Sequence, residues 1–261
     1  MSFISVQHLW KGYGGLVVLE NLNLDVMQGE FCTLVGASGC GKSTFLKMLL
    51  GQEQATRGSL TLEGEPFPGE PDRNRGIVFQ RYSVFPHLTV RQNVLLGLEL
   101  EQKPLLGKLF GKARQEAFKK VDSMLEAVGL SGASHKWPHE LSGGMQQRLA
   151  IAQSFMMRPR VLLLDEPFGA LDPGIRNDMH QLLLKLWKET GTTIFMVTHD
   201  LHEGFRLGTR LLVFDKVRRD PHDPEAYGAT ITYDLQIGKT DTDTLSDIEA
   251  NVLKTARNQA A

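Results

Sequence analysis

Cysteine is scarce in this chain of 261 residues, because only Cys32 and Cys40 are present. Two cysteines cannot form the disulfide framework of a small secreted domain, and they are typical of a protein in a reducing compartment. The N-terminus, MSFISVQHLWKGY, has neither the basic start nor the apolar core of a signal peptide. We therefore expect a protein that stays inside the cell.

Long apolar runs and net charge are also lacking. No run approaches the roughly 18 apolar residues that a membrane-spanning helix needs, so any role in a membrane process is expected from the cytoplasmic side, through a partner. The formal net charge of −1 gives no electrostatic basis for binding nucleic acid. Hydrophobic residues make up 41% and charged residues 23%, which is an ordinary globular balance.

Strand patterns occur at both ends of the chain. Residues 21–26 (NLNLDV) alternate apolar and polar side chains, as a half-buried strand does, and residues 30–35 (EFCTLV) form the apolar run of a buried parallel strand. The segment from about 3 to 35 therefore reads as a β lobe that leads into a sheet. Further strands are expected at 58–67, 76–80, 161–164 and 193–198.

Between about 86 and 158 the pattern is helical. Ala113, Ala117, Val121, Met124 or Leu125, and Val128 recur at three- and four-residue steps. Strands that alternate with helices predict an α/β fold with a parallel, doubly wound sheet, into which this helical block is inserted. We expect one domain over 1–240 and a polar, weakly ordered tail over 241–261. The strand pattern ends near residue 216.

Residues 36–43, GASGCGKS, match the phosphate-binding pattern G-x-x-x-x-G-K-[ST]. The context agrees, since an apolar strand ends at Val35 and a helix is predicted from Lys42. Glycines let such a loop aim backbone N–H groups at a phosphate, and the helix N-terminus adds positive charge. Lys42 would reach the outer phosphates, and the Ser43 hydroxyl would complete a Mg²⁺ site. The alternative is a glycine-rich turn before a helix, and Cys40 is expected to pack. The predicted nucleotide contacts are Gly36, Ala37, Ser38, Gly39, Cys40, Gly41, Lys42, Ser43 and Thr44.

A second strand end carries two acids. In VLLLDEP, Asp165 follows four apolar residues and is expected to hold Mg²⁺, whereas Glu166 is free to orient or deprotonate a water that attacks the γ-phosphate. Exposed loop charges are the alternative. His199 and Gln80 follow apolar strands in the same way. His199 can bond a phosphate oxygen or fix the water, and Gln80 can contact Mg²⁺ and water while staying neutral.

The stretch LSGGMQQR, residues 141–148, contains no acid, histidine or cysteine. Ser142, Gly143 and Gly144 instead offer a hydroxyl, backbone N–H groups and a helix N-terminus, which are donors that can cover a phosphate without adding negative charge. The simpler interpretation is an N-cap with a flexible turn, and both can hold together.

Six motifs occur in one order: the phosphate loop, VFQ, LSGGMQQR, LLLDEP, GALD and VTHD. Over residues 4–215 the chain resembles the nucleotide-binding subunits of ATP-binding cassette transporters. The resemblance implies that Tyr13 stacks on adenine, that Gln80 signals to a membrane partner, that Asp172 belongs to the D-loop and that His199 is the switch histidine. It also implies that two cassettes pair head to tail, with Ser142, Gly143 and Gly144 of one capping ATP on the other.

Met145 stands where the family signature commonly has glutamine. Methionine at this position resembles importer ATPases of the nitrate, sulfonate, taurine and betaine types. PDRNRGIVFQ and PFGALD also resemble the nitrate/sulfonate/taurine branch. The resemblance implies ATP hydrolysis, with Mg²⁺, that drives import of a small solute. The implied partners are a second ATPase subunit, forming a homodimer, permease subunits and, indirectly, a solute-binding protein, but no nucleic acid. The implied location is peripheral, on the cytoplasmic face of the inner membrane.

Two alternatives remain at this point: an exporter ATPase, and a cassette ATPase that acts on a macromolecular partner. A permease contact is expected near Gln80 and the helical block, where Tyr82, Val84 and Phe85 and the segment 103–112 bring apolar side chains. Ordinary helix packing is the other interpretation of these residues. The stretch KVRRDPHDPEAYGATITYDL departs from the family, since it is longer and more acidic than the usual continuation.

Overall fold

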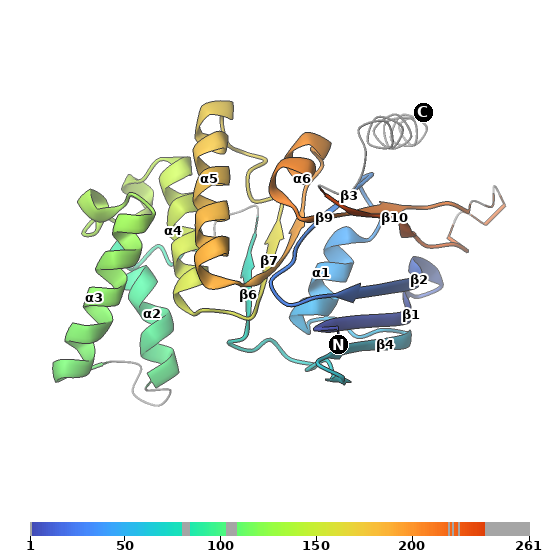
Figure 1. Ribbon diagram of the computed structural model, residues 1–261, viewed down its shortest axis with the longest axis horizontal. Coiled ribbons are helices and arrows are strands. Elements are labelled where there is room, and N and C mark those ends of the chain that lie inside the picture. Colours follow the sequence, from blue (N-terminus) through green and yellow to red (C-terminus); the bar gives the residue numbers. More distant parts are fainter. Residues whose placement is uncertain are drawn as a thin grey trace.

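The computed structural model describes residues 2–79, 84–102, 109–218, 220, 222–223 and 225–237. An antiparallel sheet occupies one side of the molecule, in the strand order β2-β1-β4-β5 (Figure 1). This sheet confirms the predicted N-terminal β lobe. Its strands are β1 (Ile4–Tyr13), β2 (Leu16–Val26), β4 (Arg57–Leu62) and β5 (Glu65–Pro66).

A second sheet has the order β10-β9-β3-β8-β7-β6 within the described residues. Its strands come from both halves of the chain, and all pairs are parallel except β10 with β9, so the predicted parallel core is confirmed. The bounds are β3 (Phe31–Gly36), β6 (Arg75–Val78), β7 (Val161–Asp165), β8 (Thr193–Val197), β9 (Arg210–Asp215) and β10 (Thr230–Gln236).

Strand β10 shows that the expected end of the strand pattern near residue 216 is wrong. Tyr233 and Leu235 pack on a small cluster beneath β9, so the chain returns to the sheet edge after the acidic stretch. The tail predicted over 241–261 lies outside the described residues.

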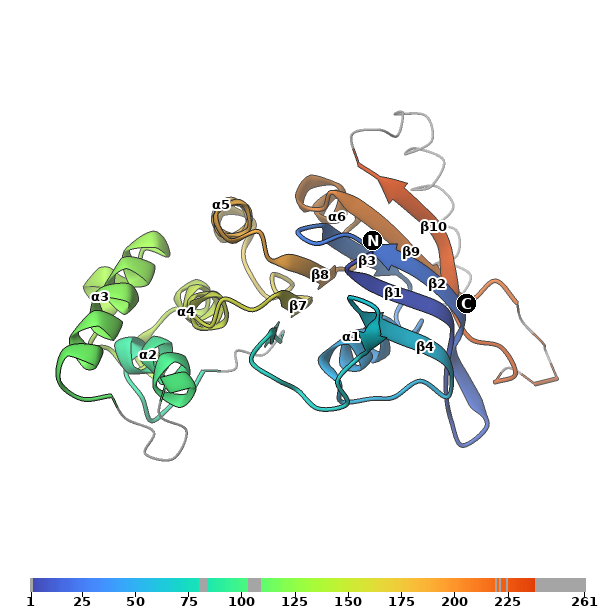
Figure 2. The same ribbon diagram turned by 60° about the horizontal axis from the view of Figure 1, so that its bottom comes forward.

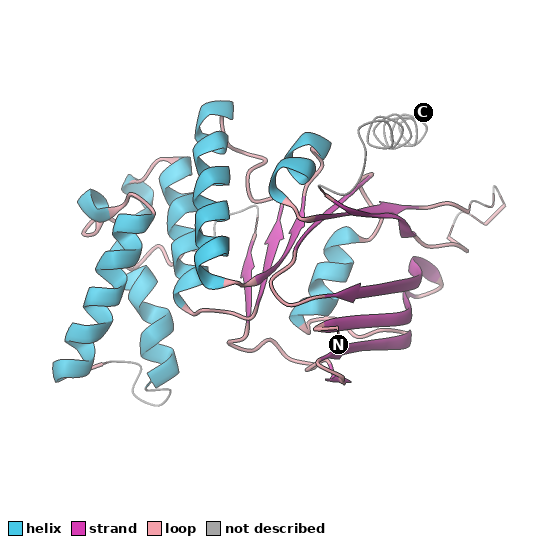
Figure 3. Cartoon of the chain, in the orientation of Figure 1, coloured by secondary structure: helices cyan, strands magenta, loops and turns pink. Residues whose placement is uncertain are grey.

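The helices form layers around the parallel sheet, as Figures 2 and 3 show. α2, α3 and α4 follow β6 in the chain, precede β7 and gather at the left of Figure 1. No helix among the described residues combines the length and apolarity needed to cross a membrane. The helices are α1 (Lys42–Leu50), α2 (Val90–Gln102), α3 (Gly111–Ala127), α4 (Gly143–Met156), α5 (Pro173–Thr190) and α6 (Leu201–Leu207), with single 3₁₀ turns at Ser131–Ala133 and Pro138–Glu140.

The two faces of the parallel sheet bury different helices. Side chains alternate along a strand, so neighbouring residues enter opposite cores. On β7, Leu163 packs with α1 and the β lobe, whereas Leu162 and Leu164 pack with α4 and α5. The helix that follows the phosphate-loop motif and the helix that follows LSGG therefore lie on opposite faces of the sheet (Figure 2).

The predicted buried face of α3 is correct at Ala117, Val121 and Val128, and it uses Leu125 rather than Met124 for full burial. Ala113 was expected on this face but is exposed. The first six residues of α3, 111–116, are exposed throughout, so burial of this helix begins at Ala117.

Candidate nucleotide site

The loop between β3 and α1 is shaped by glycines that no other residue could replace without strain. Gly36 has φ 144°, and a Cβ there would lie 2.1 Å from the Phe214 carbonyl oxygen on β9. Gly41 has φ 80°, and its Cβ would lie 2.4 Å from the Leu19 side chain of the β lobe. Both positions thus require glycine for close packing and a positive φ, so the loop is held between the two sheets.

Lys42 lies inside this loop, with 7% of its surface exposed. Its Nζ donates to the carbonyl oxygens of Gly36 at 2.8 Å and Ala37 at 2.7 Å. The ammonium is therefore held among the backbone groups that would surround a phosphate. Cys40 is buried, its Sγ donates to the Ala37 carbonyl at 2.9 Å, and burial raises the pKa of this thiol. A neutral, hydrogen-bonded thiol suits a packing role rather than that of a nucleophile.

Asp165, at the end of β7, faces the first turn of α1. The Ser43 Oγ donates to Asp165 Oδ1 at 3.3 Å. Burial, and then the charge of Glu166, raise the pKa of Asp165, against the lowering effects of the Ser43 hydrogen bond and of Lys42. A hydroxyl and a carboxylate oxygen that converge beside a phosphate loop are ligands that suit Mg²⁺. The donor set thus fits the predicted metal.

Glu166 has φ 47°, a left-handed conformation that costs a non-glycine residue about 1–3 kcal/mol. Its N–H donates to the Val197 carbonyl on β8 at 3.0 Å, which holds the turn in place. The turn directs the carboxylate toward the neighbouring strand end, where Glu166 Oε2 lies 3.6 Å from His199 Nδ1. The sheet edge thus brings these two predicted residues together.

Tyr13, at the end of β1, lies beside the phosphate-loop helix with 43% of its surface exposed. Partial burial, and then Glu53, raise the pKa of Tyr13, against the lowering effect of Thr44. Lys11 Nζ lies 4.6 Å from the ring centroid and pairs with Glu53 at 2.7 Å. Lys11 and Glu53 were missed in the sequence because only the fold brings residue 53 to the end of β1. They fix the ring and leave it accessible.

Ser142 is the N-cap of α4, and its Oγ accepts a hydrogen bond from the Met145 N–H at 3.4 Å. Ser142 and Gly143 are exposed, whereas Gly144 is buried against Ile175, whose Cγ2 would lie 2.7 Å from an added Cβ. Ser142, Gly143 and Gly144 lie at the start of α4, which packs on the sheet face opposite α1. Within one chain they therefore do not lie beside the phosphate loop.

One further predicted residue lies apart from this cluster. Asp172 is exposed at the N-cap of α5, six residues beyond Glu166 in the chain. Gln80, which was expected at the end of β6, lies outside the described residues, as does Tyr82.

The family model described as ABC transporter matches residues 19–169, more than half of the chain. This chain belongs to the ABC transporter family. The resemblance drawn from the motifs is thereby confirmed, and so is the α/β fold, because solved ABC cassettes superpose on it. The dimeric structure of MJ0796, a bacterial ABC transporter cassette, is 29% identical and has a TM-score of 0.72, with 91% of this chain and 100% of that chain covered.

Curated relatives in the family have import names. The nitrate import ATP-binding protein NrtD of Synechocystis sp. is 44% identical over 200 residues, which cover 77% of this chain and 71% of that protein. The spermidine/putrescine import ATP-binding protein PotA of Nitrosospira multiformis is 41% identical over 218 residues, 83% of this chain. The match spans only 58% of PotA, so that relative contains a large part with no counterpart in the match.

Proposed function

We propose that the chain is the ATP-binding and ATP-hydrolysing subunit of an ABC importer for a small solute. The proposal rests on five side chains that lie at one edge of the parallel sheet. They are Lys42, Ser43, Asp165, Glu166 and His199. The edge formed by the carboxyl ends of parallel strands is where ligands bind in open α/β folds. The import names of the relatives support the direction of transport.

In this proposal the residues place a water and neutralise the γ-phosphate. The water oxygen bonds to the γ-phosphorus, the bond from that phosphorus to the β–γ bridging oxygen breaks, and the Glu166 carboxylate accepts the water proton. His199, within 3.6 Å of Glu166, fixes the water or bonds a phosphate oxygen. Lys42 stabilises negative charge on the outer phosphates. Mg²⁺, held by Ser43 and Asp165 and by Gln80 as the sequence predicts, would neutralise phosphate charge when bound.

The signature residues act on the nucleotide of a second copy in this proposal. Ser142 begins α4 on the sheet face opposite α1, so the protein's own core lies between α4 and its own phosphate loop. A head-to-tail pair would bring each Ser142 to the other chain's loop and close both sites. The dimeric structure of a cassette 29% identical supports the pairing of two copies, and Asp172 would lie near the same junction.

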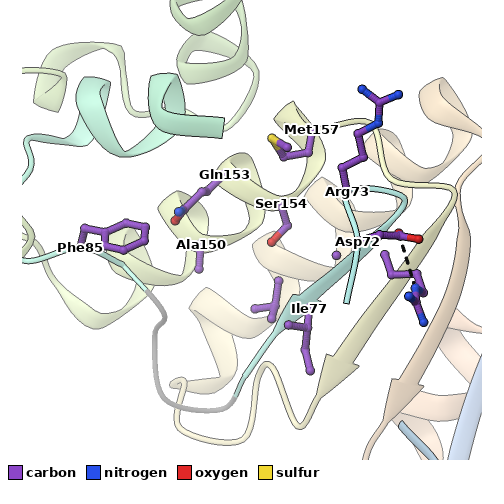
Figure 4. Close-up of a pocket in the computed structure, with 11 residues that line it drawn as sticks. Asp72, Arg73, Ile77, Phe85, Ala150, Gln153, Ser154 and Met157 are labelled. Carbon is purple, nitrogen blue, oxygen red and sulfur yellow. Dashed lines mark ion pairs between the residues drawn. The ribbon is translucent and has the colours of Figure 1, made fainter. Parts of the chain in front are cut away.

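A cleft beside β6 is the proposed contact with a permease helix (Figure 4). The cleft has a volume of about 290 Å³. One wall is formed by Ala150 and Ser154 on α4 and by Met157 at the C-cap of that helix. Ile77 on β6 lies opposite, and Phe85 lies at one end of the cleft (Figure 4). Phe85 is 39% exposed, as suits a residue that contacts a partner. The permease would place this subunit on the cytoplasmic face of the membrane and connect it indirectly to a solute-binding protein.

The transported solute is proposed to be a nitrate-, sulfonate- or taurine-like compound, from the motif resemblance and the nitrate relative. A polyamine import subunit is almost as similar. This agrees with a cassette that supplies energy while the membrane subunits choose the solute.

The decisive experiment replaces Glu166 by Gln in the full chain. We expect ATP turnover to fall about a hundredfold or more, as when a general base is lost, while ATP still binds and the closed dimer accumulates in gel filtration. Hydrolysis by the variant at the wild-type rate would show that Glu166 is not the base. Absence of ATP hydrolysis by the wild-type dimer would refute the proposed activity itself.

The permease contact has its own test. Phe85→Asp should abolish binding of the full chain to permease-containing membranes prepared from the organism that encodes it. ATP binding should be unchanged. Met27→Asp is the matched control, since Met27 is 51% exposed at a turn of the β lobe. Loss of ATP binding in Phe85→Asp would mean that Phe85 is structural.

A further inference from the structure

Helix α5 lies against both chain segments that carry the proposed catalytic pair. One segment, residues 166–172, contains Glu166 and leads into α5, and the other, residues 198–200, contains His199 and leads into α6. Arg176 and His180 are four residues apart on α5, so they project from the same face of the helix. Neither residue belongs to a motif that was used in assigning the function.

Arg176 contacts both segments at once. Its Nη2 donates to the Leu171 carbonyl oxygen at 3.2 Å, and its Nη1 lies 3.8 Å from Asp200 Oδ2. Leu171 precedes the D-loop aspartate, and Asp200 directly follows His199. A guanidinium has several donors in a rigid plane and can therefore fix two acceptors at a set separation.

His180 makes the second connection, deeper in the protein. Its Nε2 lies 2.8 Å from Glu203 Oε1, and the Thr198 hydroxyl donates to Glu203 Oε2 at 2.5 Å. The Asp200 N–H in turn donates to Thr198 Oγ1 at 3.1 Å. His180, Thr198 and Glu203 are all at least 93% buried, so breaking this chain of hydrogen bonds would leave polar groups unsatisfied in the core.

The His180 ring also contacts the Glu166 segment. It packs edge-on against Phe168, with ring centroids 5.0 Å apart. Phe168 is fully buried, two residues after Glu166. His180 Nδ1 has no hydrogen-bond partner in the described part of the chain, so the ring is oriented by Glu203 and Phe168. Phe168 belongs to the segment that contains Glu166, and Glu203 is hydrogen-bonded to Thr198 in the segment that contains His199.

We propose that Arg176 and His180 are positioning residues that hold Glu166 and His199 in register by tying both of their segments to α5. The two catalytic side chains lie 3.6 Å apart at the ends of neighbouring strands, and the placement of a water that contacts both of them tolerates little displacement. This inference rests on the proposed ATP hydrolysis.

The test compares Arg176→Met and His180→Leu with the wild-type full chain. We expect kcat for ATP hydrolysis to fall about tenfold to hundredfold, as for a displacement of about 1 Å near reacting atoms. ATP affinity measured by calorimetry should change less than about threefold, because neither side chain contacts the phosphate loop in the structure. Arg176→Lys and His180→Gln retain a donor and should restore part of kcat.

The matched control is Arg206→Met. Arg206 on α6 bonds Asn177 on α5 at 2.5 Å, so it joins the same two helices without contacting either catalytic segment. It should keep the wild-type kcat. The inference is overturned if Arg176→Met and His180→Leu keep kcat within about twofold, if they lose ATP affinity and kcat together, or if Arg206→Met has the same effect. A wild-type chain that does not hydrolyse ATP would instead refute the proposed function.

Discussion

Ser142 has two possible tasks, and replacing it by alanine separates them. Its Oγ caps α4 by accepting the Met145 N–H at 3.4 Å. A hydroxyl accepts through its lone pairs and still has one hydrogen to donate, so capping leaves the proton available for a phosphate oxygen of a second copy. Ser142→Ala removes both interactions, whereas Ser142→Thr retains both.

The two losses differ in size. Losing an N-cap costs about 1 kcal/mol, which in a chain of this size lowers the melting temperature by roughly 2–4 °C. A hydrogen bond to a charged group contributes about 1.5–3 kcal/mol, and a symmetric pair contains two of them. The closed dimer should therefore weaken by roughly 3–6 kcal/mol, which raises its dissociation constant roughly 10²- to 10⁴-fold.

The assay measures the dimer and the monomer separately. Sedimentation with saturating ATP in the Glu166→Gln background gives the dissociation constant, and calorimetric unfolding without nucleotide gives the stability of the monomer. If Ser142→Ala shifts the dissociation constant by less than about threefold while the melting temperature falls as expected, Ser142 is only a helix cap. In that case the proposed capping of a second chain's nucleotide is wrong.

Three further outcomes follow from the same site. Asp165→Asn should raise the stability of the nucleotide-free chain at pH 7 and abolish the Mg²⁺-dependent part of its stabilisation by ATP. Burial raises the pKa of folded Asp165. The wild type therefore loses stability relative to the variant as pH rises from below about 4 through the folded pKa. A stability difference between wild type and variant that is the same at pH 3 and pH 7 would contradict the argument. Mixing Ser142→Arg with Lys42→Ala, each inactive alone, should restore one working site per mixed dimer, and no activity in the mixture would refute pairing in trans. Tyr13→Ala should weaken ATP binding measured by calorimetry about tenfold, given about 1–3 kcal/mol for stacking on a base, and unchanged affinity would remove Tyr13 from the adenine site.

The sequence predicted best where the determinants are local. The phosphate loop follows from glycines at fixed spacing between an apolar strand and a helix, and the structure shows why Gly36 and Gly41 cannot carry a side chain. Asp165 and Glu166 follow directly from a buried strand. The resemblance to a family supplied what geometry in one chain cannot, namely the expectation that Ser142 belongs to a site completed by another copy.

The missed features depend on distant contacts. β10 alternates Ile231, Tyr233 and Leu235, a readable strand pattern, but it follows an acidic, proline-containing stretch, and only pairing with β9 makes it part of the sheet. Arg176 and His180 resemble polar residues of a solvated helix face. His180 becomes buried because α6 brings Glu203 against it, 23 residues along the chain.

The placement of α1 and α4 on opposite faces of one sheet also bears on the stoichiometry of the proposed pair. In that pairing, each chain offers one loop that would receive a nucleotide and one turn that would cover the nucleotide of the other chain. A two-fold symmetric pair uses every such surface, because contact i-to-j is repeated as j-to-i, and it leaves none for a third copy. A pair of this symmetry would therefore close at two chains and two nucleotides, whereas one cassette alone would leave its nucleotide uncovered.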